Sequence, residues 1–176
     1  MGRSLLLTGH PGIGKTTVIR QVVKQLGDRA GGFYTEEIKG PGGRQGFQLI
    51  TLDGKETILA HKDLRGPNVP RIGRYGVDVD ALERVGVKAL QRARDAGKIV
   101  IVDEIGRMEL FSGKFQETLM YAFMGRSTVI GTVIKKSYPE ADAFKILAQV
   151  EVWELNQRNR DEMASRILKW LKRRDR

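Results

Sequence analysis

Apolar and polar residues follow one another along this chain in the order expected for alternating strands and helices. Runs of consecutive apolar residues, typical of strands buried on both faces, occur at 4–8, 99–102 and 128–134, and 150–155 alternates as a strand. Apolar residues at helical spacing predict helices that begin near residues 16, 80, 115, 139 and 160. This order predicts an α/β fold of three layers, in which a mainly parallel, doubly wound sheet lies between two layers of helices.

The segment 32–59 departs from this alternation. Its β-rich runs are separated by glycine-rich turns, and such punctuation is typical of hairpins. We therefore expect an antiparallel β-ribbon over about 32–59, either inserted in the sheet or added to its edge. A long loop is expected at 63–75, where Arg65, Arg71 and Arg74 either serve a polyanionic ligand or are ordinary surface residues.

One glycine-rich stretch carries specific phosphate chemistry. It fits the P-loop, or Walker A, pattern G-x-x-x-x-G-K-[ST] at every fixed position and reads Gly9-His10-Pro11-Gly12-Ile13-Gly14-Lys15-Thr16. Because a buried strand precedes it and a helix follows it, backbone N–H groups and the helix N-terminus face one anion. Lys15 reaches the β- and γ-phosphate oxygens, and the Thr16 hydroxyl is placed to ligate the Mg²⁺ that bridges them. The expected phosphate-binding residues are this whole stretch and Thr17.

A second part of the expected site follows the strand at 99–102. Asp103 and Glu104 end this strand at the edge where open α/β sheets bind ligands. We expect Asp103 to hold Mg²⁺ through a water, opposite Thr16, and Glu104 to orient or deprotonate the water that attacks the γ-phosphate. The alternative is that the acids only cap the following turn and accept hydrogen bonds from the neighbouring loop.

Hydrolysis also needs a cation that stabilises the charge on the transferring phosphoryl group. Arg107 is the first choice, because it stands in the loop after the acidic pair. Arg126 and the arginines at 65–74 are alternatives. The expected catalytic residues are therefore Lys15, Glu104 and Arg107.

Three polar residues open the last helix just beyond the last strand, at the ligand edge of the sheet. They are Asn156, Asn159 and Arg160. An arginine plane can stack on any base and an amide can hydrogen-bond its edge, so we expect a nucleobase site with weak selectivity here. The alternative is that Asn159 only caps the helix.

Composition narrows the class of protein. The length of 176 residues suits a single domain, 1–176, and no apolar run is long enough to span a membrane, so we expect a cytoplasmic protein that acts as a monomer. Cysteine is absent, which excludes disulfides, zinc-thiolate sites and cysteine nucleophiles. The net charge of +10 suits a polyanionic small ligand, whereas nucleic-acid binding is disfavoured because no RNA-binding aromatic signature accompanies the charge. Abundant charge and few Asn are typical of a heat-adapted protein.

The chain resembles the cancer-related nucleoside-triphosphatase family of P-loop proteins over nearly its whole length. The matching segments, besides the P-loop, are Gly32-Phe33-Tyr34-Thr35-Glu36-Glu37, Gly43-Arg44 with Gly46-Phe47, Gly73-Arg74-Tyr75, Asp103-Glu104-Ile105-Gly106-Arg107-Met108-Glu109-Leu110-Phe111, Gly131-Thr132 and Asn159-Arg160. The resemblance implies a RecA-like P-loop fold and Mg²⁺-dependent hydrolysis of ATP, GTP and other nucleoside triphosphates. It also implies a nucleobase site near Asn159 and Arg160, although Asn156 stands where the family pattern leads us to expect Thr.

The residues and the resemblance together predict a Mg²⁺-dependent nucleoside-triphosphatase. Two other functions stay open. The same phosphate cradle serves a nucleotide or small-molecule kinase, and the arginine-bearing loop would suit an acceptor phosphate. A nucleotide-dependent switch associated with RNA would use the positive surface as its working face.

Overall fold

Five parallel strands form the core of the molecule. The computed structural model describes residues 2–173. The parallel strands lie side by side in the order β2-β7-β8-β1-β9, and their bounds are Ala30–Gly40, Ile99–Ile105, Val129–Val133, Ser4–Thr8 and Val150–Glu154. β8 therefore separates β1, which leads into the P-loop, from β7, which ends at the acidic pair. The carboxyl ends of all three meet at one edge of the sheet, where a doubly wound fold binds its ligand.

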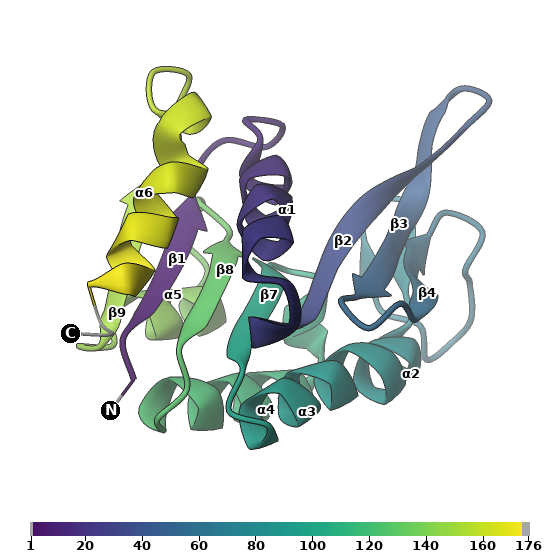
Figure 1. Ribbon diagram of the computed structural model, residues 1–176. Coiled ribbons are helices and arrows are strands. Elements are labelled where there is room, and N and C mark those ends of the chain that lie inside the picture. Colours follow the sequence, from purple (N-terminus) through teal and green to yellow (C-terminus); the bar gives the residue numbers. More distant parts are fainter. Residues whose placement is uncertain (1, 174–176) are drawn as a thin grey trace.

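Helices cover both faces of this sheet (Figure 1). On one face, α1 (Lys15–Leu26) packs against α6 (Arg160–Lys172), and their buried residues form one core cluster with Leu5, Leu7 and Ile101. On the other face, a second cluster joins Leu6, Val100 and Val102 to α3 (Lys88–Asp95), α4 (Gly113–Met124) and α5 (Pro139–Lys145). Neighbouring strand residues thus serve opposite cores, because side chains alternate across a strand. The predicted α/β fold with three layers is confirmed.

The antiparallel part extends the sheet at one edge, in the order β5-β6-β4-β3-β2. β2 belongs to both parts, because its first residues pair in parallel with β7 and the rest pairs with β3 (Gly43–Thr51). β4 (Glu56–His61) completes the predicted ribbon, which is added to the edge and not inserted. In Figure 1, β2 and β3 rise beyond the body of the sheet to the level of the P-loop. The expected long loop at 63–75 is partly wrong, because a short hairpin of β5 (Arg71–Ile72) and β6 (Tyr75–Val77) lies there.

The remaining helical segments follow the sequence with small differences. The helix expected from residue 80 is a continuous run of α2 (Val79–Ala81), the π-helical segment η2 (Leu82–Val87) and α3, and Asp78 caps it by accepting a hydrogen bond from the Ala81 N–H. Two 3₁₀ turns, η1 (Gly27–Arg29) and η3 (Glu109–Phe111), follow α1 and β7.

The apolar residues of α6 at helical spacing are Ala164, Ile167, Leu168 and Leu171. Ile167 and Leu171 are buried, whereas Ala164 and Leu168 are half-buried, and Met163 and Trp170 complete the buried face. The indole N–H of Trp170 donates to Glu151 at 2.9 Å, which fixes the rotation of the helix. Basic residues gather in the sequence at 169–174. Lys169 and Lys172 lie in the last turn of α6, and Arg174 lies outside the described residues. Within 2–173, no helix has the length and apolar character that a membrane crossing requires.

Gly32 of β2 pairs with Ile101 of β7 and gives a test of this packing. Its φ is +121°, and a Cβ there would lie 2.0 Å from the carbonyl oxygen of Ile101. Gly32→Ala should lower the free energy of unfolding by about 2–4 kcal/mol, because it adds backbone strain to a steric clash. Gly113→Ala, at the open start of α4, is the matched control and should change it by less than about 1 kcal/mol. Equal stability of the two variants in urea unfolding would contradict this register.

Candidate active site

The P-loop joins β1 to α1 and depends on two glycines for its conformation. Gly12 and Gly14 have φ values of +79° and +114°, which side chains rarely adopt, and Gly14 is the N-cap of α1. The Lys15 ammonium folds back over the loop and donates to the carbonyl oxygens of Gly9 at 2.9 Å and His10 at 3.3 Å. The loop therefore has the conformation that presents N–H groups and one cation to an anion.

Asp103 connects the P-loop helix to the centre of the sheet. It is 1% exposed, and its two carboxylate oxygens accept hydrogen bonds from the hydroxyls of Thr16 at 2.7 Å and Thr132 at 2.5 Å. Burial raises the pKa of Asp103, while the two threonine hydrogen bonds and the charge of Lys15 lower it. Thr132 comes from β8, the strand between β1 and β7, so the carboxylate at the end of β7 is bonded both to β8 and to the start of α1.

These oxygens match what Mg²⁺ requires. The described residues contain no cluster of three or more His, Cys, Asp and Glu side chains that could hold a metal without help. Mg²⁺ in phosphate-transfer sites is held by only one or two carboxylates together with substrate phosphates, and it retains several waters. The adjacent Thr16 hydroxyl and Asp103 carboxylate fit that donor set, and a cation there would offset the burial of the carboxylate.

Glu104 and Glu109 face each other across Gly106. A Cβ on Gly106 would lie 2.6 Å from Oε1 of Glu104 and 3.0 Å from Oε2 of Glu109, so both carboxyl groups lie against this residue. Burial raises the pKa of Glu104, and the charge of Asp103 adds to the effect while that of Lys15 opposes it. Burial and then the charge of Glu104 raise the pKa of Glu109 to about 8. A backbone N–H of Gly106 donates to Glu109 at 3.2 Å.

The acids, Lys15 and Arg107 line one cavity of about 720 Å³, which also includes Thr16 and Thr17. Arg107 is exposed and forms no ion pair or side-chain hydrogen bond with any residue in 2–173, so it is available to an anionic ligand. Of the alternative cations, Arg126 precedes β8 and therefore lies at the amino end of the strands, away from the P-loop. Arg65, Arg71 and Arg74 do not line this cavity, whereas Arg44 of β3 does.

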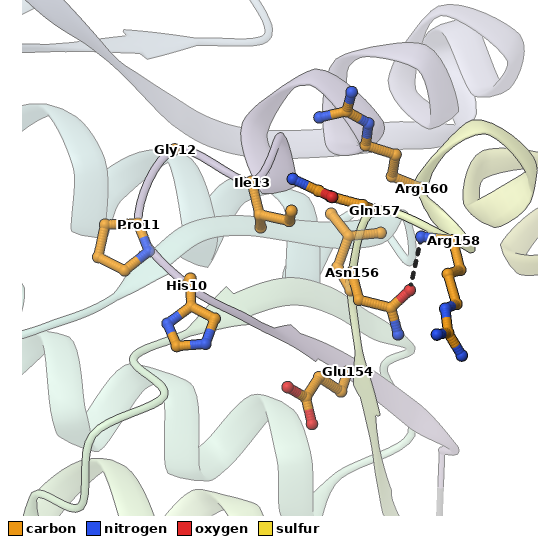
Figure 2. Close-up of a pocket in the computed structure, with 10 residues that line it drawn as sticks. His10, Pro11, Gly12, Ile13, Glu154, Asn156, Gln157, Arg158 and Arg160 are labelled. Carbon is orange, nitrogen blue, oxygen red and sulfur yellow. Dashed lines mark hydrogen bonds between the residues drawn. The ribbon is translucent and has the colours of Figure 1, made fainter.

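A second cavity of about 650 Å³ lies on the other side of the P-loop. Figure 2 shows the loop residues from His10 to Ile13 on one side of it and the segment from Glu154 to Arg160 on the other. Pro11 and Gly12 line both cavities, so the loop forms the boundary between them. The arrangement offers one space to phosphates and a neighbouring space to a base.

The three residues expected at the base differ in their surroundings. Arg160 and Asn156 line the second cavity, and the side-chain oxygen Oδ1 of Asn156 accepts hydrogen bonds from the backbone N–H groups of Arg158 at 2.9 Å and Asn159 at 3.1 Å. Asn159 does not line it. Its amide binds the N–H of Asn156 and the carbonyl of Glu154, at 2.9 and 2.8 Å, so it braces the turn and its side chain does not cap α6.

Several residues in or next to the two cavities were not assigned a role from the sequence. Thr132, Glu109 and Arg44 occur in the segments that carry the family resemblance, but each reaches the site through strand order or loop folding. Glu154 lines the second cavity. The Lys135 ammonium donates to the Glu154 carboxylate at 2.5 Å and lies 3.4 Å from Nε2 of His10. An acid at the carboxyl end of a strand was the one local signal for Glu154.

The fold and the site define the class of the protein. A parallel sheet places a P-loop and a strand that ends in Asp103 at one edge, with a hydroxyl and a carboxylate in contact between them. This is the arrangement of a P-loop protein that binds nucleoside triphosphates.

Comparison with known proteins defines the family. The NTPase family matches residues 4–168. The nucleoside-triphosphatase THEP1 of Thermotoga maritima is 45% identical over 168 residues, which cover 96% of this chain and 95% of that protein. The crystal structure of THEP1 from Aquifex aeolicus has a TM-score of 0.88 at 35% identity and covers 96% of this chain and 98% of that one. The solution structure of a human cancer-related nucleoside triphosphatase has a TM-score of 0.80 at 32% identity, with 97% of each chain covered. This chain belongs to the NTPase family, which confirms the resemblance seen in the sequence.

The buried Glu109 predicts a dependence of stability on pH. Its pKa of about 8 in the folded protein exceeds the ordinary 4.5, so the folded state holds a proton that the unfolded chain releases. The free energy of unfolding therefore falls as the pH rises from 4.5 to 8. Glu109→Gln removes this contribution, so the variant should gain stability relative to the wild type with rising pH, by up to about 1.4 kcal/mol per pH unit.

Urea unfolding at a series of pH values from 5 to 8, without Mg²⁺ or nucleotide, measures this difference. Glu117→Gln is the matched control, because Glu117 is exposed on α4 and water solvates it in both states. It should keep the wild-type pH profile. Parallel profiles for Glu109→Gln and the wild type would show that Glu109 is ionised in the folded protein.

Proposed function

We propose that the protein hydrolyses nucleoside triphosphates of several bases to the diphosphate and phosphate, with Mg²⁺. The single observation that carries this proposal is the hydrogen bond of 2.7 Å between Thr16 and Asp103, with Glu104 lining the same cavity one residue further along. The first two residues supply a metal-binding pair, and the third supplies a second acid. A second acid is needed when water is the nucleophile, because water must be oriented and must lose a proton.

The P-loop would bind the phosphates and set their position. Its N–H groups would hold the β-phosphate, and Lys15 would exchange the carbonyl oxygens of Gly9 and His10 for phosphate oxygens. Thr16 and Asp103 would hold Mg²⁺, which neutralises negative charge on the phosphates when it is bound. Arg107, exposed in the same cavity, would stabilise the charge on the transferring phosphoryl group.

Glu104 would accept the proton of the attacking water. Burial and the neighbouring Asp103 raise the pKa of Glu104, which strengthens it as a base once it has lost its own proton. Lys15 lowers that pKa and so favours the ionised form near the phosphates. Glu104 would therefore be a stronger base than an exposed carboxylate and would still be ionised in part of the molecules. General-base catalysis near neutral pH requires both properties.

The base would lie in the cavity between the P-loop and the start of α6. The Arg160 guanidinium can stack on any base. The side-chain oxygen of Asn156 is used in two hydrogen bonds within the turn, so its NH2 group would be the one that contacts the base. Stacking does not distinguish one base from another. This lining supports hydrolysis of several nucleoside triphosphates with weak selectivity.

Glu104→Gln tests the chemical step. The variant should bind ATP with Mg²⁺ as tightly as the wild type or more tightly, because one negative charge near the phosphates is removed. Its kcat should fall about 10²- to 10⁴-fold, the usual contribution of a positioned proton acceptor. Equilibrium ATP binding and single-turnover hydrolysis should be measured on one preparation.

Lys15→Ala is the contrasting variant, because it removes contacts made both before and during the reaction. It should lose ATP binding and hydrolysis together while remaining folded. A normal hydrolysis rate in Glu104→Gln would remove Glu104 from the mechanism, and lost ATP binding would place it among the groups that hold the metal. Near wild-type hydrolysis by Lys15→Ala would contradict the whole assignment.

Arg160→Ala tests the base site. The KM should rise for ATP, GTP, CTP and UTP together by about 2- to 30-fold with little change in kcat, because stacking on a guanidinium contributes to binding alone. Arg166→Ala is the matched control, since Arg166 lies on the same helix over Trp153 and does not line the cavity. Unchanged KM values in Arg160→Ala, measured over the four nucleotides, would exclude this base site.

A further inference from the structure

The cavity that holds Lys15 and Glu104 extends beyond the groups used so far. Its far wall is made by the β-ribbon and carries Lys39, Arg44 and Phe47. These three side chains have no part in the hydrolytic mechanism. We call this part of the cavity, between Glu104 and the ribbon, the ribbon subsite.

Strand register explains why the ribbon faces the cavity with these residues. Glu37 pairs with Phe47 and Lys39 pairs with Arg44 across β2 and β3. Directly opposed residues lie on one face of a ribbon, and all four line the cavity. The ribbon subsite is therefore a built surface and not a chance gathering of flexible side chains.

Arg44 is fixed in place before any ligand binds. Its guanidinium donates to Glu37 and to the hydroxyl of Tyr75, each at 2.9 Å, and lies 4.9 Å from the centre of the Phe47 ring. Its cross-strand neighbour Lys39 is exposed and forms no ion pair or side-chain hydrogen bond with the described residues. A fixed guanidinium beside an unpaired ammonium is suited to a phosphate or carboxylate group.

Apolar side chains complete the lining next to these cations and the carboxylates of Glu36 and Glu37. Besides Phe47, they are Leu59 of β4 and Ile72 of β5. Sites for small molecules combine such an apolar lining with a few placed polar groups. The ribbon subsite has this character.

The position of the nucleotide leaves the ribbon subsite free. This step depends on the proposed function, in which the base lies in the second cavity and the phosphates lie along the P-loop. Pro11 and Gly12 separate the two cavities, so the γ-phosphate points away from the base and toward Glu104. The ribbon subsite then lies beyond the γ-phosphate, on the side from which a nucleophile in line with the leaving oxygen must approach.

We propose that the ribbon subsite binds a second substrate, a small molecule that carries a hydroxyl group and a phosphate or carboxylate. Lys39 and Arg44 hold the anionic group, and the hydroxyl reaches the γ-phosphate beside Glu104. A bond forms between the hydroxyl oxygen and the γ-phosphorus, and the bond from that phosphorus to the bridging oxygen breaks. The electron pair leaves with the nucleoside diphosphate, and Glu104 takes the hydroxyl proton. Water in the same position gives hydrolysis, so the protein is a phosphotransferase that also acts on water.

Transfer of label from [γ-³²P]ATP tests this proposal in the full-length wild-type protein with Mg²⁺. The probes are ribose 5-phosphate and glycerol 3-phosphate for the phosphate arm and D-glycerate for the carboxylate arm. Ribose and glycerol are their neutral counterparts. At least one anionic probe should give a labelled phosphate ester, and its neutral counterpart should leave the label in inorganic phosphate.

Lys39→Ala locates the second substrate. The KM for the active probe should rise about 10- to 100-fold, the usual effect of losing a hydrogen bond to a charged group. Hydrolysis without acceptor should stay at the wild-type rate, because Lys39 does not belong to the hydrolytic site. Lys55→Ala is the matched control, since Lys55 is exposed between β3 and β4 and does not line the cavity. It should resemble the wild type in both reactions.

Each outcome decides between the proposals. ATP consumption with label only in inorganic phosphate, for all anionic probes, overturns the phosphotransferase proposal and leaves the hydrolase intact. No consumption of any nucleoside triphosphate, with or without probe, overturns both. Transfer that Lys39→Ala does not weaken overturns the placement of the acceptor at the ribbon.

Discussion

The buried carboxylate of Asp103 is the constraint on which the site depends. It needs hydrogen bonds in place of water, and it receives them from Thr16 at the start of α1 and Thr132 in β8. Both donors are available only because β8 lies between β1 and β7, with the three carboxyl ends at one edge. The strand order thus fixes the distance from the P-loop to the acidic strand. Every later element of the site, from Glu104 to the loop with Arg107, is positioned from this carboxylate.

Three carboxyl groups lie close together at this edge of the sheet, and their burial lowers the stability of the folded protein unless a cation or a proton compensates their charge. Burial raises the pKa of Asp103, Glu104 and Glu109, and the coulombic effects of Asp103 on Glu104, and of Glu104 on Glu109, add to it. Buried charge of one sign is tolerated where a cation offsets it, and Lys15 supplies part of that compensation. Under the proposed function, the Asp103 carboxylate would favour Mg²⁺ at this end of the group. Stability given up at this edge would then correspond to affinity for the metal and to basicity at Glu104.

Local patterns predicted the parts of the structure that depend on neighbouring residues. Consecutive apolar residues predicted the strands at 4–8 and 99–102. The spacing of glycines predicted the P-loop, and glycine-rich turns between β-rich runs predicted the ribbon at 32–59. Arg126 and Arg44 show where such reasoning ends. Position along the chain made Arg126 an alternative cation, but the parallel strand it precedes places it at the opposite end of the sheet. Arg44 lines the cavity because of the register in which β3 pairs with β2. The residues around Arg44 in the sequence do not determine this register, since it depends on how the two strands pack in the folded protein. Glu109 was missed for the same reason, since the fold of the loop around Gly106 brings it to Glu104.

The ribbon also bears on the balance between hydrolysis and transfer. β2 continues past the end of β7 because β3 supplies its hydrogen bonds, so the ribbon reaches the level of the P-loop on one side (Figure 1). In the proposed reaction, a wall on that side would offer fixed groups to a larger nucleophile. The cavity of about 720 Å³ is larger than a single water molecule needs, and its ribbon end carries Phe47 and Arg44, which a larger nucleophile could contact. Under the proposed transfer, slow reaction with water and fast reaction with a fitted hydroxyl would be two consequences of one geometry. The shape of the wall, and not the phosphate cradle that all P-loop proteins share, is where the specificity of this protein would reside.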